Sequence, residues 1–382
     1  MPVPLLDVNA QNHPLHDGFS AAFERVFQTG HFIMGEEIAA FEREVQPLTG
    51  CRHAISISSG TDAILLALMA LEVGPGDEVL CPAFTFFATA GCVSRVGATP
   101  VFVDVLPDSF NIDVADARAK ITPKTRAIIP VHLFGQCANM EAVMQLANEH
   151  LLHVIEDAAQ AIGASRHGNL AGSIGHFGCY SFFPSKNLGG LGDGGLLATN
   201  DGDLALRAKS LRNHGMEPKY YHSHIGGNFR MDALQAAFLR VKLPHYAGYT
   251  EKRQINAAFY HEELSKLPGV AFSSRDADAQ LLLPECGEGN VHIWNQFTLR
   301  VPGNGRRDAL KQHLIDRKIG CEIYYPLTLD QQECFAQLPE SSLRGCGVSH
   351  QLAEEVLSIP IYSELTEPQK QEVVEAITAF LN

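Results

Sequence analysis

Short β-branched runs alternate with segments of helical periodicity between about residues 51 and 200, and this alternation constrains the fold more than any other feature of the sequence. A strand followed by an amphipathic segment is typical of βαβ units, which build a mostly parallel sheet. Two intervening segments, residues 61–71 and 140–150, carry an apolar face at helical spacing. The expected strands are residues 53–57, 78–81, 100–103, 127–132, 153–156, 178–182 and 196–199. Seven strands predict one large α/β domain.

The pattern of the sequence changes after Leu243 and Pro244. The C-terminal residues predict a charged helix, a half-buried strand of alternating apolar and polar residues, and two further helices. These elements are expected at residues 249–266, 292–301, 306–317 and 368–381. We therefore predict a large α/β domain with an N-terminal arm at residues 1–243 and a small α+β domain at residues 244–382.

Charge and composition exclude several classes of protein. The 382 residues include 29 Lys and Arg against 43 Asp and Glu, and this formal charge of −14 argues against binding nucleic acid or an anionic membrane. No run approaches the roughly 18 apolar residues of a transmembrane helix, and we expect no signal or transit peptide. Nine cysteines without a C-x-x-C pair predict reduced thiols in a cytoplasmic protein. No metal site is expected, since His222 and His224 lack a third ligand at suitable spacing.

Small polar residues come after the first expected strand, namely Ser58, Ser59, Gly60, Thr61 and Asp62. Such residues leave the N–H groups of a helix start open, and the helix dipole adds partial positive charge, so the segment has the chemistry of a phosphate-binding site. Serine, threonine and aspartate are also good N-cap residues, so an ordinary capped helix has the same sequence. From this segment alone, the capped helix is the favoured interpretation and the phosphate site is the alternative.

Asp157 and Gln160 come after the strand expected at residues 153–156. A carboxylate held at a strand end can keep a pyridine nitrogen protonated, which makes the ring an electron sink. The same spacing resembles a capping box, in which Gln160 returns a hydrogen bond to the start of a helix. From the spacing alone, the capping box is the favoured interpretation.

Lys186 lies between an aromatic strand end and a glycine-rich loop. A lysine is usually a solvated surface charge, but this setting can desolvate the amine and lower its pKa enough for imine formation. Residues 190–195 then match G-x-G-x-x-G. A dinucleotide-binding motif must follow a strand directly and open a helix, whereas these residues follow a loop and precede a strand, so we reject that interpretation.

A polar loop precedes the helical pattern that begins near Met231. Asn228 and Arg230 lie in this loop, and an arginine there can clamp a phosphate or carboxylate, although near a helix start it is more often a surface residue. The apolar stripe of the helix is typical of a core or of a subunit contact. It consists of Met231, Leu234, Ala237 and Phe238.

Taken in order, these segments resemble one family closely: the fold type I pyridoxal-phosphate (PLP) sugar aminotransferases of the DegT/DnrJ/EryC1/StrS group. The resemblance runs from about Leu5 to the C-terminus, and the order and spacing of its motifs make it specific. The motifs are S-G-T-D-A at 59–63, P-A-F-T-F at 82–86, E-D-A-A-Q at 156–160, S-F-F-P-S-K-N-L-G at 181–189, G-D-G-G at 192–195, R-N-H-G at 212–215 and N-F-R-M-D-A-L-Q-A-A at 228–237.

The resemblance implies PLP, and its amino form PMP, as cofactor and two catalytic residues. Lys186 would bind the cofactor aldehyde as an imine and, once released, act as general base and then acid. Asp157 would pair with the pyridinium nitrogen. Gln160 would lie near the phenolic oxygen and Phe86 would stack on the ring. The cofactor phosphate would be held by Gly60, Thr61, Asp62 and Ser181.

A homodimer with shared active sites is also implied, because the residue at the position of Asn228 reaches the phosphate bound by the neighbouring subunit. Arg230 matches a position that contacts the substrate sugar or its diphosphate. The expected partners are the amino donor, the keto-sugar and a second copy of the chain, with neither nucleic acid nor a membrane.

Two tyrosines in the C-terminal part, Tyr324 and Tyr325, match substrate contacts of the family, although packing in a core or interface explains such tyrosines equally well. The chain departs from the family pattern directly afterwards. Many relatives have Pro-Leu-His where this chain has Thr328-Leu329-Asp330. The sugar contact of that histidine is therefore not carried over to this chain.

The expected function is a ping-pong transfer of an amino group from an amino acid, L-glutamate, to a keto-sugar. A 3- or 4-keto sugar linked to dTDP or UDP is the favoured acceptor. The alternatives are a free keto-sugar or cyclitol as acceptor, as in antibiotic pathways, and a non-catalytic regulator that binds PLP or a sugar. A sugar dehydratase of the same fold is disfavoured, because such relatives have histidine at the position of Lys186.

Overall fold

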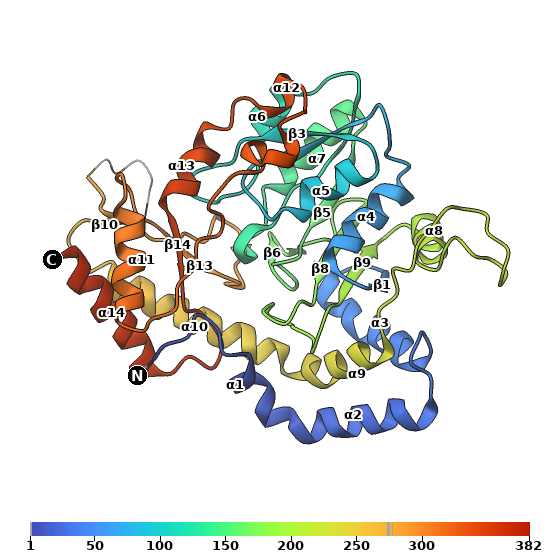
Figure 1. Cartoon of the computed structure of the whole chain (residues 1–382), viewed down its shortest axis with the longest axis horizontal. Helices are drawn as coiled ribbons and strands as arrows, with labels where there is room; N and C mark the ends of the chain where they lie inside the picture. The colour runs from blue at the N-terminus through green and yellow to red at the C-terminus, as the bar shows by residue number, and fades with distance from the viewer. Residues whose placement is uncertain (1, 273–275, 277) are drawn as a thin grey trace.

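A seven-stranded sheet forms the centre of the molecule (Figure 1), for which the computed structural model describes residues 2–272, 276 and 278–382. Its strands are β1 (His53–Ile57), β2 (Glu78–Pro82), β3 (Thr99–Val103), β4 (Thr125–Ile128), β5 (His153–Asp157), β8 (Phe177–Ser181) and β9 (Gly195–Thr199). They lie in the order β1-β9-β8-β5-β4-β2-β3. Strand β9 is antiparallel to both its neighbours, and the other pairs are parallel. The predicted mostly parallel sheet of an α/β domain is confirmed.

Helices cover both faces of this sheet. They are α3 (Glu36–Thr49), α4 (Gly60–Ala70), α5 (Ala88–Arg95), α6 (Val114–Ala119), α7 (Met140–His150), α8 (Gly202–Arg212) and α9 (Ala233–Lys242). Leu197 of β9 packs in one core with α4, α5 and α8, whereas Leu196 and Ala198 pack in another with α3 and α9. Successive side chains of a strand point to opposite faces. Because both faces are covered, β9 is apolar at successive positions.

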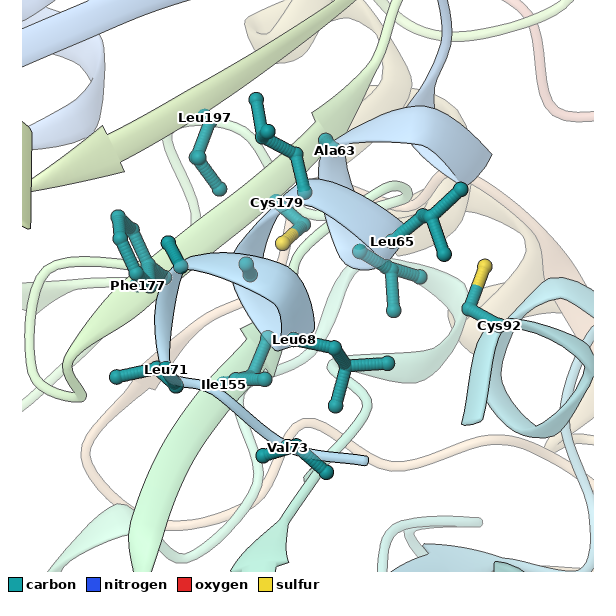
Figure 2. Close-up of a cluster of buried hydrophobic side chains, with 14 of the residues drawn as sticks. Ala63, Leu65, Leu68, Leu71, Val73, Cys92, Ile155, Phe177, Cys179 and Leu197 are labelled. Carbon is teal, nitrogen blue, oxygen red and sulfur yellow. The ribbon is translucent and has the colours of Figure 1, made fainter. Parts of the chain in front are cut away.

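Helix α4 is apolar around its circumference and nearly all of its residues are buried. Figure 2 shows Leu65 and Leu68 of this helix together with Cys92 of α5 and Leu197 of the sheet. Core packing therefore holds the helix in place. Its N-terminus, at Gly60, is fixed close to the carboxyl end of β1.

Two strands are shorter than the sequence predicts. Strand β4 stops before residue 132, because Pro130 has no N–H group to continue the ladder. Strand β13 (Phe297–Arg300) starts after residue 292, because the preceding backbone turns toward the large sheet, where Asn295 N–H donates to the carbonyl of Phe134. The other strands predicted for the large sheet, and helices α4 and α7, agree with the structure to within one residue.

A second sheet, of four strands, lies in the C-terminal part of the chain in the order β10-β11-β13-β14. Its other strands and the helices around it are β10 (Val270–Ala271), β11 (Leu281–Leu282), β14 (Val356–Ile359), α10 (Tyr246–Leu264), α11 (Arg306–Asp316) and α14 (Glu367–Leu381). These elements share a separate core, which also contains Val3, whose backbone bridges Ile319. The division of the chain between residues 243 and 244 stays a prediction.

The remaining elements connect or flank these two parts. They are α1 (Val8–Asn12), α2 (His16–Thr29), α12 (Glu340–Leu343), α13 (Gly347–Glu355) and a small sheet of β6 (Ser165–Arg166), β7 (Asn169–Leu170) and β12 (Asn290–Val291). Helix α2 packs along α9 (Figure 1), through Ala22 and Val26. Within the described residues, no helix is both long enough and apolar enough to cross a membrane. All nine cysteines belong to the described part, and none forms a disulfide there.

Candidate active site

A cavity of about 450 Å³ lies at the carboxyl ends of β1, β2, β5 and β8. Open α/β sheets bind their ligands at this edge. Asn295 and Gln296, which precede β13, contribute to its wall from the C-terminal half of the chain. Nine residues that the sequence predicts for the site line this cavity: Gly60, Thr61, Phe86, Asp157, Gln160, Ser181, Lys186, Tyr324 and Tyr325.

Lys186 lies in the loop after β8 and faces the cavity. Its backbone N–H donates to the carbonyl of Phe183, which starts the turn that carries the side chain. Burial of the amine lowers the pKa of Lys186 to about 8, and the negative charge of Asp157 partly opposes this shift. An amine that is partly neutral near physiological pH is a nucleophile for carbonyl carbon. A solvated surface charge is therefore excluded for this lysine.

Asp157 ends β5 and is buried at the cavity wall. Burial raises the pKa of its carboxyl group, while hydrogen bonds from the Thr89 hydroxyl and the Ala159 N–H, and the charge of Lys186, act in the opposite direction. The favoured capping-box interpretation is wrong, because turns follow Asp157 where that interpretation requires a helix. The carboxylate is instead a buried acceptor that faces ligand space.

Gln160 has its amide orientation fixed by two neighbours. Its Oε1 accepts a hydrogen bond from Phe134 N–H at 2.7 Å, and its Nε2 donates to the Tyr325 hydroxyl at 3.3 Å. Because Oε1 is held by a backbone donor, the amide N–H groups are the ones directed to the cavity side. The site therefore offers a donor beside Asp157.

The start of α4 forms the opposite end of the cavity. Ser59 is the N-cap, and its hydroxyl accepts from Asp62 N–H at 3.0 Å. The first N–H groups of a helix have no partner inside the helix, and Gly60, Thr61 and Ser181 face the cavity there. The helix is thus capped and also able to bind a phosphate, so both interpretations of this segment hold.

A close approach explains the glycine at the start of α4. A Cβ atom at Gly60 would lie 2.8 Å from the Cβ of Ser181, so a side chain there would push β8 away. Asp62 is not among the residues that line the cavity. Its carboxylate accepts from the Ser58 hydroxyl at 2.6 Å and so stabilises the turn behind the helix start.

Asn228 and Arg230 are not brought to the cavity of their own chain. Asn228 is exposed, and its backbone forms a β-bridge with Asn213. Arg230 donates a hydrogen bond to the side-chain oxygen of Asn213. Both belong to the segment between α8 and α9, part of which projects from the body of the molecule (Figure 1). The rejection of residues 190–195 as a dinucleotide motif is confirmed, because they lead into β9 and no helix follows directly.

The departure at residues 328–330 has a structural explanation. Asp330 is buried, and its Oδ2 accepts from His350 Nε2 of α13 at 2.6 Å. Leu329 N–H donates to the carbonyl of Ala83, directly before the segment that carries Phe86. Asp330 thus takes part in packing α13 on the large sheet and does not line the cavity.

Several residues at the site were not singled out by the sequence. Thr85 and Thr89 come after β2, four residues apart, and this helical spacing was the available signal. Asn295 donates to Asn187 Oδ1 at 2.8 Å, next to Lys186 in the chain. These residues are 108 positions apart in sequence, and no local pattern connects them.

A family model for the DegT/DnrJ/EryC1/StrS aminotransferase family matches residues 15–378. The chain belongs to this family. It is 44% identical over 100% of its length to a "Pleiotropic regulatory protein" of Geobacillus stearothermophilus, of which the match covers 99%. It is equally 44% identical, over 100% of its length and 98% of the relative, to a UDP-N-acetyl-3-dehydro-alpha-D-glucosamine 3-aminotransferase of Acidithiobacillus ferrooxidans.

A crystal structure of S. venezuelae DesV in complex with a ketimine intermediate has the same fold. The TM-score is 0.92, with 38% identity over 100% of this chain and 99% of that one. The chain is a PLP-dependent aminotransferase.

The residues of the cavity fit PLP. An amine of lowered pKa faces the same space as a buried carboxylate, and a helix N-terminus provides donors for a phosphate group. Phe86 presents an exposed ring to that space. The amine of Lys186 suits the aldehyde of the cofactor, and the Asp157 carboxylate suits its ring nitrogen. The start of α4 suits the phosphate, and Phe86 suits the flat face of the ring.

Proposed function

We propose that this aminotransferase moves an amino group from L-glutamate to a keto-sugar linked to a nucleotide, at C3 or C4 of the sugar, with UDP or dTDP as the carrier. The observation that carries the proposal is that Lys186 and Asp157 face the same cavity, which has a volume of about 450 Å³. The choice of a nucleotide-linked keto-sugar is supported by the related protein from Acidithiobacillus ferrooxidans. The name of that protein specifies a UDP-linked 3-dehydro sugar, and its similarity spans the whole chain.

Two residues would carry the chemistry. When bound, PLP supplies an electron sink for the carbanion formed at the reacting carbon. Lys186 would hold the cofactor aldehyde, and its Nζ, when free, would accept a proton and return it. Its pKa of about 8 leaves part of this amine unprotonated near neutral pH. Asp157 holds the proton of the ring nitrogen in place, so the sink keeps its charge.

Other residues would bind and orient. Gln160 would donate from Nε2 to the phenolic oxygen, because Phe134 holds its Oε1. Phe86 would stack on the ring. The phosphate is bound by the start of α4, through Gly60 and Thr61, and by Ser181, while Asp62 supports this turn from behind. Tyr324 and Tyr325, which close the cavity from the C-terminal half, contact the substrate.

We also propose a cytoplasmic homodimer with shared sites. Asn228 and Arg230 lie outside the cavity of their own chain, in a segment that partly projects from the molecule. A second copy would receive Asn228 at its cofactor phosphate and Arg230 at its sugar or diphosphate. A mixture of inactive Lys186→Ala and Asn228→Ala chains then regains activity, because each heterodimer contains one site with both residues intact. No recovery in verified heterodimers contradicts this sharing.

The function is tested by following the visible absorbance of the holoenzyme in two half-reactions. L-glutamate is expected to bleach the band of the bound aldehyde form, and a keto-sugar of the correct class is expected to restore it. A panel of UDP- and dTDP-linked 3- and 4-keto sugars, with a free keto-sugar and a cyclitol, identifies the acceptor. Restoration by the free compounds alone contradicts the nucleotide-sugar proposal. A band that no amino donor bleaches would favour a regulator, the description of the Geobacillus stearothermophilus relative.

A further inference from the structure

Thr89 is fully buried in the first turn of α5 and has none of the roles assigned above. Its hydroxyl donates to Asp157 Oδ2 at 2.8 Å, while Ala159 N–H donates to Oδ1 at 3.2 Å. With one donor on each oxygen, the carboxylate is held against rotation about its Cβ–Cγ bond. Each carboxylate oxygen accepts about two hydrogen bonds, so Asp157 keeps capacity for a donor in the cavity.

We propose that Thr89 is a positioning residue for transamination, whose hydroxyl orients the Asp157 carboxylate and keeps it ionised for the ring nitrogen of the cofactor. This inference rests on the role proposed above for Asp157. Thr89 acts through Asp157, because it is not among the residues that line the cavity.

A hydrogen bond from Thr89 counteracts the effect of burial on the pKa of Asp157. Burial raises the pKa of Asp157, and a protonated carboxyl cannot hold the charge of a protonated ring nitrogen. The Thr89 hydroxyl, the Ala159 N–H and the Lys186 ammonium each lower that pKa. The Thr89 and Ala159 donors are neutral groups of the chain itself, so their stabilisation of the carboxylate does not depend on the charge of Lys186.

A second threonine, Thr85, lies beside Thr89. Its Oγ1 lies 3.5 Å from Thr89 Oγ1. A hydroxyl has one proton, and Thr89 uses it toward Asp157, so Thr85 is the donor of this pair. At 3.5 Å this contact is longer than an ordinary bond between hydroxyls, so the orientation of the Thr89 hydroxyl comes mainly from Asp157. Thr85 lines the cavity, and the hydroxyl of Thr89 reaches the Asp157 carboxylate.

The test compares Thr89→Val, which removes only the hydroxyl, with Thr89→Ser, which keeps it. PLP is titrated into the apoprotein, and Thr89→Val is expected to bind it about tenfold more weakly, whereas Thr89→Ser binds it as the parent does. The matched control is Thr298→Val in β13. Thr298 is also a buried threonine with a hydroxyl contact of 2.8 Å, to Ser358 in the second sheet, and its loss is expected to leave PLP affinity unchanged.

A second titration uses 1-deazapyridoxal 5′-phosphate, in which a C–H group replaces the ring nitrogen. The parent and Thr89→Val are expected to bind this analogue equally, because Asp157 has no ring nitrogen to pair with. Equal weakening of both ligands by Thr89→Val indicates a structural role and overturns the proposal, as does unchanged PLP affinity. If circular dichroism shows that Thr89→Val does not fold, Thr89→Ala takes its place.

The Asp157→Asn variant shows whether a negative result concerns the proposed role of Thr89 or the proposed role of Asp157. If Asp157→Asn binds PLP and the analogue as the parent does, the role of Asp157 itself is wrong. If Asp157→Asn weakens PLP selectively and Thr89→Val does not, Asp157 keeps its role and only the inference about Thr89 fails.

Discussion

Two lysines, Lys186 at the cavity and Lys242 at the end of α9, show why a lowered pKa does not by itself indicate a catalytic amine. Burial lowers the pKa of each to about 8. In each case one carboxylate partly opposes the shift: Asp157 for Lys186 and Glu364 for Lys242. By pKa alone, the two amines are equivalent.

Their surroundings differ. Lys186 lines a cavity together with a carboxylate, an amide donor and a helix N-terminus. Lys242 has no exposed surface, and its Nζ has no hydrogen-bond partner in the part of the chain that the structure describes. A lowered pKa therefore reports desolvation, and only the convergence of other groups on accessible space indicates chemistry.

The largest expected difference is in the rate of transamination. Lys186→Ala is expected to lower kcat roughly a thousandfold or more, because the proposed general base and cofactor anchor are then both lost. Lys242→Met, at a lysine with the same pKa, is expected to leave kcat unchanged. Stopped-flow absorbance with L-glutamate measures both. A Lys186→Ala enzyme with the parental rate would remove the distinction between the two lysines.

The two carboxylates sharpen the same comparison. Asp157→Asn is expected to lower kcat roughly a hundredfold, because a buried charge partner is removed. Glu364→Gln is expected to have no such effect, since its carboxylate interacts with Lys242 outside the site. Steady-state kinetics at one pH measure kcat of both variants. A similar loss of kcat in the two would contradict the special role of Asp157.

The free energy of unfolding is expected to change when Lys242 is replaced, although kcat does not. An isolated buried ammonium is unfavourable, so Lys242→Met is expected to raise the free energy of unfolding at pH 7 by about 1–3 kcal/mol. Lys242 binds its proton more weakly in the folded chain than in the unfolded one, so its penalty is complete below about pH 8 and falls toward pH 10.5. Urea unfolding of the parent and the variant at pH 7 and pH 10 measures this gain. A gain that does not shrink with pH shows that charge is not its cause.

The smallest expected effect concerns a polar group at the rim of the site. Tyr325→Phe removes the acceptor of the Gln160 Nε2 hydrogen bond and is expected to raise the KM of the sugar about threefold. Tyr260→Phe is the control, because the Tyr260 hydroxyl is buried in the second core without a hydrogen-bond partner among the described residues. Equal KM values in the two variants would show that Tyr325 acts by packing alone.

Local sequence patterns predicted most of the fold. Alternation and helical spacing are properties of neighbouring residues, so the large-sheet strands and helices α4 and α7 were predicted closely. Strand β4 was predicted too long because Pro130 interrupts a run that is otherwise apolar. The motif residues Lys186 and Asp157 do meet at one cavity, as expected from their positions at strand ends.

Spacing misled where a side chain finds its partner far along the chain. The position of Gln160 predicted a capping box, yet its amide bonds to Phe134 and to Tyr325, which is 165 residues away. Lys242 lies in a helix at a position with no local sign of burial. The carboxylate whose charge acts on its amine, Glu364, belongs to a distant segment of the chain.

The sequence by itself determined the strands of the large sheet, the polar residues at their ends and the family, because these depend on short-range pattern and motif spacing. The tertiary structure alone decided which of two equally perturbed lysines faces a cavity, which way the Gln160 amide points and which hydroxyl supports Asp157. Those properties arise from contacts between distant segments, where burial and geometry act on groups whose local sequence does not record them.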